Sequence, residues 1–195
     1  MSADPEPPPP ATRYAYKPSR LTAVWEFELA PDAIEWAAGG RRGRLPYADI
    51  RRMRLSFRPR SMQTHRFVAE IWSTRGGKLR LASSSPRSMA EYEAHDAAYA
   101  AFLDELHRRL AAARSPATFE CGLAPLRYWP GVAIFAAVSL MLAALIVRAL
   151  ASANRSAMLL LGALLAIFLW QGGAFFRRNR PRRYRPETPP RDLLP

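Results

Sequence analysis

The pattern of hydrophobic and polar residues changes twice along the chain, and the changes divide it into three parts. From about residue 20, apolar residues alternate with polar ones in short runs, which is typical of half-buried β-strands. Near residue 92 the apolar spacing becomes three, four and seven, as on one face of an α-helix. Beyond residue 128, two runs are almost wholly apolar. The pattern therefore predicts an α+β domain followed by two transmembrane helices.

Six short strands are expected in the domain. They cover residues 25–29, 34–36, 44–46, 50–58, 65–73 and 78–81. The strand at 50–58 has the clearest alternation, with Met53, Leu55 and Phe57 on one face and arginines on the other. Glycine pairs at 39–40 and 76–77 favour tight hairpin turns. Residues 1–19 are rich in proline, so we expect a disordered or extended arm that adds nothing to the core.

One amphipathic helix is expected after the strands. The residues Ser88-Met89-Ala90-Glu91 form a capping-box pattern, which predicts that the helix begins there. Its apolar stripe consists of Tyr92, Tyr99, Phe102, Leu103, Leu106 and Leu110. The domain is expected to span 20–113 and to fold alone, and 114–127 is expected to be a linker.

Two apolar segments near the C-terminus are long enough to cross a bilayer. Residues 129–147 and 157–176 contain no charged side chain. At 1.5 Å per residue, each matches a hydrocarbon core of about 30 Å. Two buried helices of a soluble bundle are the alternative, but such helices rarely lack a polar face. We expect transmembrane helices at 128–150 and 157–176, an external loop at 151–156 and a basic cytoplasmic tail at 177–195.

The arginines flanking these segments predict the orientation of the protein. Arg148 and Arg155 flank the loop, whereas Arg127 and six arginines between 177 and 185 lie at the other ends. The positive-inside rule then places both termini in the cytoplasm, as in a two-pass protein of the cell inner (plasma) membrane. The first 20 residues lack an apolar stretch, so no secretory signal peptide is expected.

Several short motifs together resemble a known family. They are Ala30-Pro31-Asp32 before Ile34-Glu35-Trp36, the segment Leu45-Pro46-Tyr47-Ala48-Asp49-Ile50, the Gly76-Gly77 turn and Phe102-Leu103-Asp104-Glu105-Leu106. In this order they resemble the bacterial pleckstrin-homology-like domain of small membrane proteins over residues 21–112. The resemblance implies a small antiparallel β-barrel capped by a C-terminal amphipathic helix. It does not imply phosphoinositide binding, because the first loop is short and contains Asp32.

The net charge of +13 comes almost entirely from arginine, since lysine occurs only at Lys17 and Lys78. Nine arginines lie between residues 41 and 66, where Asp49 is the only acid. The candidate contacts to an anionic surface are Arg41, Arg42, Arg44, Arg52, Arg54 and Arg58. Near a cytoplasmic leaflet each such residue contributes about 1 kcal/mol. The alternative is a solvated charged face, enlarged by the bias of a GC-rich genome.

The sequence offers no arrangement for catalysis, a metal or a cofactor. His65, His95 and His107 lack the spacing of metal ligands, and His95 and His107 are expected on the helix surface. Glu26 and Glu28 share a strand face, where a solvated surface is favoured over a catalytic carboxylate pair. Cys121 is the only cysteine, so no internal disulfide forms, and a passive linker thiol is favoured over a reactive one.

The sequence is compatible with three functions. The leading hypothesis is a membrane-anchored, non-enzymatic interaction module whose domain binds a protein partner or the anionic membrane surface. The second is an accessory or assembly subunit of a larger membrane complex, docked through the transmembrane hairpin. The third is an enzyme with a site that one sequence does not reveal. Nucleic-acid binding is disfavoured because exposed aromatics are not interleaved with the arginines. No small-molecule substrate is expected.

Overall fold

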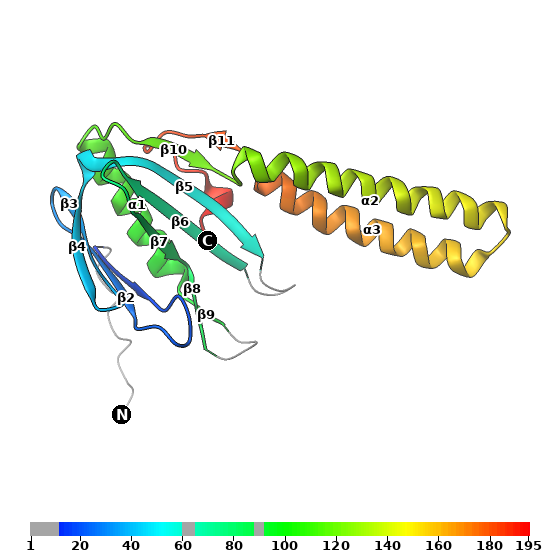
Figure 1. The fold of residues 1–195 in the computed structure, drawn as a ribbon, viewed down its shortest axis with the longest axis horizontal. Coiled ribbons are helices and arrows are strands. Elements are labelled where there is room, and N and C mark those ends of the chain that lie inside the picture. The colour runs from blue at the N-terminus through cyan, green and yellow to red at the C-terminus, as the bar shows by residue number, and fades with distance from the viewer. Residues whose placement is uncertain (1–11, 60–64, 88–91) are drawn as a thin grey trace, which may run out of the picture. The chain divides into compact units, whose positions relative to one another are not determined.

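The computed structural model describes residues 12–59, 65–87 and 92–195, and the chain divides into two compact units. The first unit combines Met1–Cys121 with Arg182–Pro195, and the second is the intervening Gly122–Pro181. The first contains sheets and one long helix, and the second is a helical hairpin (Figure 1). The α+β class is therefore confirmed, and we describe the two units separately.

The first sheet has four antiparallel strands in sequential order. They are β1 (Arg13–Tyr16), β2 (Trp25–Leu29), β3 (Ala33–Ala38) and β4 (Arg41–Pro46). The β3–β4 hairpin turns at Gly39 and Gly40, whose φ angles are +58° and +78°. Glycine adopts this left-handed conformation without strain, so the predicted tight turn is confirmed.

The second sheet has five strands in the order β11–β10–β5–β6–β7. They are β5 (Ile50–Pro59), β6 (His65–Ser73), β7 (Lys78–Ala82), β10 (Thr118–Cys121) and β11 (Arg182–Arg183). Strand β10 runs parallel to β5, and the other pairs are antiparallel. A minor hairpin pairs β8 (Ser84–Pro86) with β9 (Tyr92–Ala94), and short 3₁₀ turns occupy Tyr47–Asp49 (η1) and Arg191–Leu193 (η2). Within the described residues no ladder joins the two main sheets, so a closed barrel is not shown.

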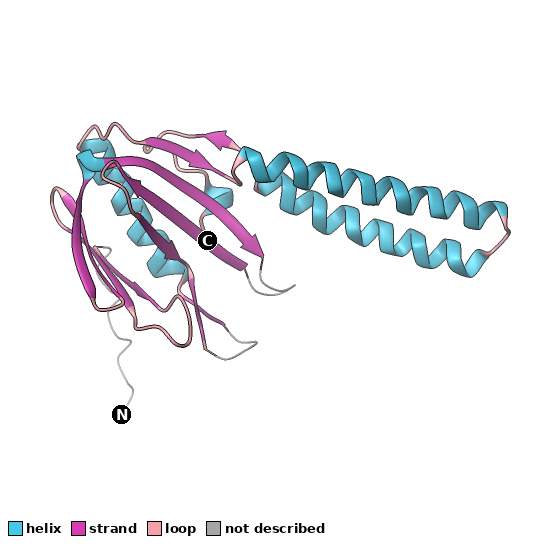
Figure 2. Ribbon diagram, in the orientation of Figure 1, coloured by secondary structure: helices cyan, strands magenta, loops and turns pink. Residues whose placement is uncertain are grey.

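Helix α1 (Asp96–Ala112) lies between the two main sheets (Figure 2). It buries Tyr99, Phe102, Leu103, Leu106, His107 and Leu110. The predicted capping box at Ser88–Glu91 lies outside the described residues, and the helix begins later, after His95. Tyr92, predicted on the helical stripe, belongs instead to β9. The β8–β9 pairing explains the shift, since His95 donates its backbone N–H to the Ser83 carbonyl just before the helix begins.

The N-terminal arm was expected to add nothing to the core, but it contains strand β1, which does contribute to the core. Tyr14 and Tyr16 are buried, and their hydroxyls donate to the carbonyls of Ala82 at 2.6 Å and Arg80 at 2.5 Å. The two tyrosines thus link the first sheet to the edge strand β7 of the second. The alternation in this segment covers only four residues after a proline run, so the sequence signal was too short to predict a strand.

The C-terminal residues also belong to the first unit. Strand β10 lies in the segment predicted to be a linker, and β11 lies in the predicted basic tail. The Tyr184 N–H donates to the Phe119 carbonyl at 3.1 Å, and Leu193 is only 1% exposed. The chain therefore leaves the second sheet at Cys121 and returns to it at Arg182, which is the paired residue on the neighbouring strand.

The second unit consists of α2 (Pro125–Ala151) and α3 (Arg155–Arg178). Both are long and apolar enough to cross a membrane, and they extend slightly beyond the predicted segments. Only Tyr128, Leu142 and Ala149 are buried in α2, and no residue is buried in α3. The helices therefore do not have the buried surface of soluble core helices, and the structure is consistent with a two-pass membrane protein.

Candidate interaction surfaces

The arginines that cluster in the sequence lie on two different sheets. Arg41, Arg42 and Arg44 are exposed on β4, the edge strand of the first sheet. Arg52, Arg54 and Arg58 lie on β5, in the interior of the second sheet. The six candidate residues therefore do not form one continuous strand face, and each group has its own surroundings.

On the second sheet, a row of alternating charges crosses all five strands. The register places these residues side by side: Arg183, Glu120, Arg54, Glu70 and Arg80. Arg54 donates from Nε and Nη2 to one carboxylate oxygen of Glu120, and only 12% of its side chain is exposed. Cross-strand opposite charges of this kind stabilise a sheet. Arg54 therefore has a structural partner that the sequence analysis did not assign.

Glu70 is the most buried acid of this row, with 8% exposure. Lys78 Nζ lies 2.7 Å and Arg58 Nη2 lies 3.8 Å from its Oε1. Burial alone would raise the pKa of the Glu70 carboxyl, but the hydrogen bond from Lys78 and the charges of Lys78, Arg58 and Arg80 outweigh it. The pKa therefore lies below its ordinary value, and Glu70 stays ionised at neutral pH.

Trp72 is surrounded by cations on the same face of the second sheet. The Arg52 Cζ lies 4.2 Å from the ring centroid, Lys78 Nζ lies 5.3 Å and Arg54 Cζ lies 5.6 Å away. Each distance is short enough for a cation–π attraction. Arg52 is half-buried, so it packs on the indole rather than extending as a fully solvated side chain.

One further arginine of the sequence cluster differs from the predicted solvated face. Arg66 is only 3% exposed, so it is a buried residue of β6 rather than a surface residue. Arg60 lies outside the described residues. The basic cluster is therefore partly a structural feature of the second sheet, and its exposed cations are fewer than the sequence indicated.

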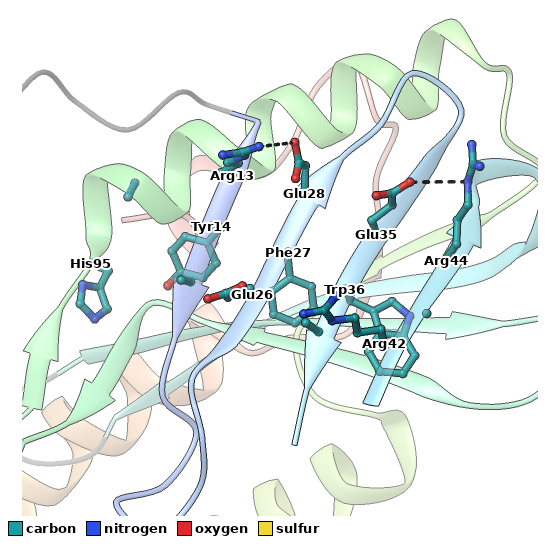
Figure 3. A pocket seen from close by; sticks show the side chains of 14 residues that line it. Arg13, Tyr14, Glu26, Phe27, Glu28, Glu35, Trp36, Arg42, Arg44 and His95 are labelled. Atoms are coloured by element: carbon teal, nitrogen blue, oxygen red, sulfur yellow. Dashed lines mark hydrogen bonds and ion pairs between the residues drawn. The ribbon is translucent and has the colours of Figure 1, made fainter. Parts of the chain in front are cut away.

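The first sheet presents a second charged row, which Figure 3 shows across the four strands. The register aligns Arg13, Glu28, Glu35 and Arg44. Arg13 Nη2 lies 3.0 Å from Glu28 Oε1, and Arg44 lies 4.0 Å from Glu35 and 2.5 Å from Asp32. Each of these side chains is about half exposed or more, so each ion pair is weak.

A hollow of about 1010 Å³ lies at this charged row. Besides the row, it is lined by Glu26, Arg42, Trp36 and His95 among others. Glu26 and Glu28 both project from β2 and are exposed, as expected for a solvated strand face. Within the described residues no carboxylate lies within ion-pair distance of Arg42. Arg42 is therefore a cation of the hollow that remains available to a ligand.

The histidines and the cysteine do not form a reactive site. His107 is buried, contrary to the expected surface position, and its Nε2 lies 3.0 Å from the Tyr184 hydroxyl. Burial lowers the pKa of His107, so the ring is neutral at pH 7. Burial also raises the pKa of Cys121, whose Sγ lies 3.2 Å from Arg182 Nε, so its thiol is not activated.

His95 contacts a serine hydroxyl, but the two side chains do not form a catalytic group. His95 Nε2 lies 2.9 Å from Ser85 Oγ, which also accepts the Lys17 backbone N–H. This contact connects β8 to the start of α1, and no carboxylate is hydrogen-bonded to the ring within the described residues. In the part of the chain that the structure describes, no group of three or more metal-ligating side chains occurs.

Comparison with known proteins finds no matching family model, no similar curated protein and no similar solved structure. The function must therefore be inferred from the chain itself. Three features of the chain bear on its function: the inserted apolar hairpin, the net basic face of the second sheet and the exposed edge of the first sheet.

Proposed function

We propose that this chain is a membrane-anchored, non-enzymatic interaction module. One observation carries the proposal: two apolar helices are inserted between the paired strands β10 and β11 of a folded domain. Only residues 122–124 and 179–181 connect the helices to these strands. A domain on such short connections stays beside the bilayer, where it can engage partners at the membrane surface.

The proposal includes the topology predicted from the arginines. Since β10 and β11 pair with each other, both ends of the helical hairpin return to the same domain. If both helices cross the bilayer, the domain and the C-terminus must lie on one side. The positive-inside rule makes that side the cytoplasmic face of the inner (plasma) membrane, because Arg127, Arg177, Arg178 and Arg180 flank it.

We also propose that the domain is pleckstrin-homology-like. Two successive sheets, β1 to β4 and β5 to β7, followed by one amphipathic helix, are consistent with that resemblance. The added strands β10 and β11 would then be an extension that carries the membrane hairpin. The domain would serve as a rigid support for binding surfaces, and no catalytic residue is assigned.

Alkaline extraction of membranes tests the anchoring. The full chain should remain in the membrane pellet at high pH and should be released only by detergent, as expected for helices buried in lipid. Release by alkali alone would show that the chain is peripheral, and the proposal would be wrong. Recovery of the detergent-extracted protein in a stoichiometric membrane complex would favour the accessory-subunit hypothesis instead.

A second measurement tests contact with anionic headgroups. In a variant with residues 122–181 replaced by a short turn, vesicle binding should require anionic lipid and weaken with salt. Changing Arg52 and Arg58 to Ser should reduce it by about 1 kcal/mol per residue. The matched control changes Arg108 and Arg114 of the helix end, with the same loss of charge. Equal effects from both pairs would show that only net charge matters.

A further inference from the structure

The outer edge of β4 is an unpaired strand edge. Within the described residues β4 pairs only with β3. Residues on either side of the two-residue Gly39–Gly40 turn form a hydrogen-bonded pair, and such pairs then recur at every second position. By this alternation Gly43 occupies a hydrogen-bonded position, and so does Tyr47, four residues later. Accordingly, the Tyr47 N–H donates to the Asp32 carbonyl at 3.0 Å.

The alternation of hydrogen-bonded and non-hydrogen-bonded pairs identifies the backbone groups of β4 that face away from β3. The N–H and C=O groups of Arg42 and Arg44 point outward, because these residues occupy the alternate, non-hydrogen-bonded positions. No hydrogen bond to these four groups occurs within the described residues. They form a regular row of donors and acceptors that a further strand would satisfy.

The side chains of β4 define the chemistry of a matching strand. Arg42 and Arg44 lie two positions apart on the face that lines the hollow, and both are exposed. Gly43 lies between them with the Trp36 ring over it, so close that a Cβ there would lie 2.5 Å from the indole. On one face the edge thus presents Arg42, which has no ion pair within the described residues, and Arg44, whose pairs with Asp32 and Glu35 are exposed and weak. A half-buried aromatic ring lies beside the other face.

We propose that the β4 edge binds an extended acidic segment of a partner protein as an added antiparallel strand. Acidic residues two positions apart would face Arg42 and Arg44, and an apolar residue between them would contact the side of Trp36. In an antiparallel pair, residues opposite the outward-facing arginines direct their own N–H and C=O groups toward β4. Main-chain hydrogen bonds would provide affinity, and the charge pattern would provide specificity.

Charge complementarity favours this occupant over a second copy of the chain. Two β4 edges paired with each other would bring like charges together, because the strand carries Arg41, Arg42 and Arg44 and no acid. Like charges directly opposite each other destabilise a sheet. Arginines at an edge also discourage nonspecific strand pairing. An acidic strand is the partner that this arrangement admits.

The inference names a partner for the proposed interaction module, and its test does not depend on membrane anchoring. Full-length protein in a non-ionic detergent is titrated into a fluorescein-labelled peptide of alternating Glu and Val, and anisotropy is measured. Binding should be saturable, and a Lys–Val peptide should not bind. The Arg42→Glu variant should bind several-fold more weakly, whereas Arg51→Glu, the matched change on the second sheet, should bind as the wild type does.

Backbone methylation separates strand addition from simple charge attraction. N-methyl groups on the Glu amides, which would face β4, should weaken binding by about tenfold or more, since they remove main-chain hydrogen bonds. N-methyl groups on the Val amides, which would face away, should leave binding nearly unchanged. Equal binding of the two methylated peptides, or no binding of the parent peptide, would overturn the inference. Alkaline extraction reports on the anchoring independently of either result.

Discussion

Two core tyrosines differ in whether their hydroxyl groups are hydrogen-bonded. The rings of Tyr14 and Tyr99 pack edge to face with centroids 5.7 Å apart. Tyr14 donates its hydroxyl to the Ala82 carbonyl, whereas the Tyr99 hydroxyl is buried and has no hydrogen-bond partner among the described residues. Burial raises the pKa of both phenols, so both are neutral. An unpaired buried hydroxyl costs free energy of folding.

We expect Tyr14→Phe to destabilise the domain and Tyr99→Phe not to destabilise it. Removing the unpaired Tyr99 hydroxyl should leave the free energy of unfolding unchanged or raise it by about 1 kcal/mol, because a desolvation cost disappears. Removing the paired Tyr14 hydroxyl should lower it by about 1 kcal/mol and leave the Ala82 carbonyl unsatisfied. Urea unfolding in detergent measures both. A loss from Tyr99→Phe as large as that from Tyr14→Phe would contradict the assigned environments.

The ionised Glu70 carboxylate should make stability depend on acid pH. Its pKa is lowered in the folded state, so its contribution is complete above the ordinary value of 4.5 and is lost as the pH falls through the folded value. Glu70→Gln should lower the free energy of unfolding at pH 7 and flatten its decline between about pH 5 and pH 3. Glu187→Gln, at an exposed position, is the control. An unchanged acid profile in Glu70→Gln would contradict the proposed coupling.

At the scale of elements, the α2–α3 contact depends on glycines that face aromatic rings. The Phe135 ring lies against Phe168 and Phe176, at centroid distances of 4.9 Å and 5.2 Å. A Cβ at Gly172 would lie 2.2 Å from the Phe135 ring, whereas a Cβ at Gly173 would meet no atom within 4 Å. Only glycine at position 172 admits the ring, as in other closely packed membrane helices.

Neighbouring glycines therefore provide a matched pair of variants. Gly172→Leu should force the helices apart and lower the thermal stability of the full chain in detergent, by about 1–3 kcal/mol or more. Gly173→Leu adds the same volume and helix propensity at an open position, so it should be tolerated. Both are compared by size-exclusion chromatography after heating. If Gly173→Leu is equally damaging, the ring contact does not determine the packing of the hairpin.

The elements that the sequence predicted well are those with long, regular patterns. The alternation at 50–58 and 65–73 matches β5 and β6, and both apolar runs match α2 and α3. The elements that were missed are short or depend on distant partners. Strand β10 has only the alternation of Phe119 and Cys121, and β11 has two arginines in a proline-rich tail. Their pairing depends on tertiary contacts that no local pattern encodes.

The candidate arginines were predicted less well than the strands that carry them. Alternation correctly placed Arg52, Arg54 and Arg58 on one strand face, since the periodicity of a strand is local. It did not indicate that Arg54 is paired with Glu120, because the two residues are 66 positions apart and meet only through the parallel β10–β5 pairing. Charge counted along the sequence therefore overestimates the cations that are available to a ligand.

At the scale of the whole molecule, the chain completes its domain only after the second apolar helix. His107 of α1 contacts Tyr184, and η2 places Leu193 in the core. A chain ending before residue 182 would lack both contacts and leave the Phe119 side of the core uncovered. The compact unit is therefore larger than the domain predicted at 20–113, which also omits Tyr14 and Tyr16 of β1.

The topology predicts which positions are accessible on each side of the membrane. Because both ends of the hairpin return to one sheet, cysteines introduced at Glu187 and Asn154 should lie on opposite sides, after Cys121 is changed to Ser. A membrane-impermeant maleimide added to intact cells should label position 154 and leave 187 unlabelled until the cells are opened. Labelling of position 187 in intact cells would reverse the orientation, and labelling of both would contradict two complete crossings.

We expect that the membrane hairpin can be removed without unfolding the domain. Cys121 and Arg182 are paired neighbours, so a turn of two to four Gly and Ser residues can join them in place of 122–181. This shortened chain should be soluble without detergent, show mixed α and β circular dichroism and unfold cooperatively.

The matched variant that also lacks residues 182–195 should aggregate or unfold more easily, because Leu193 and Tyr184 no longer cover the core. If both variants are equally stable, the C-terminal segment is not part of the domain. If neither folds, the apolar helices are needed for folding and do not serve as an anchor alone.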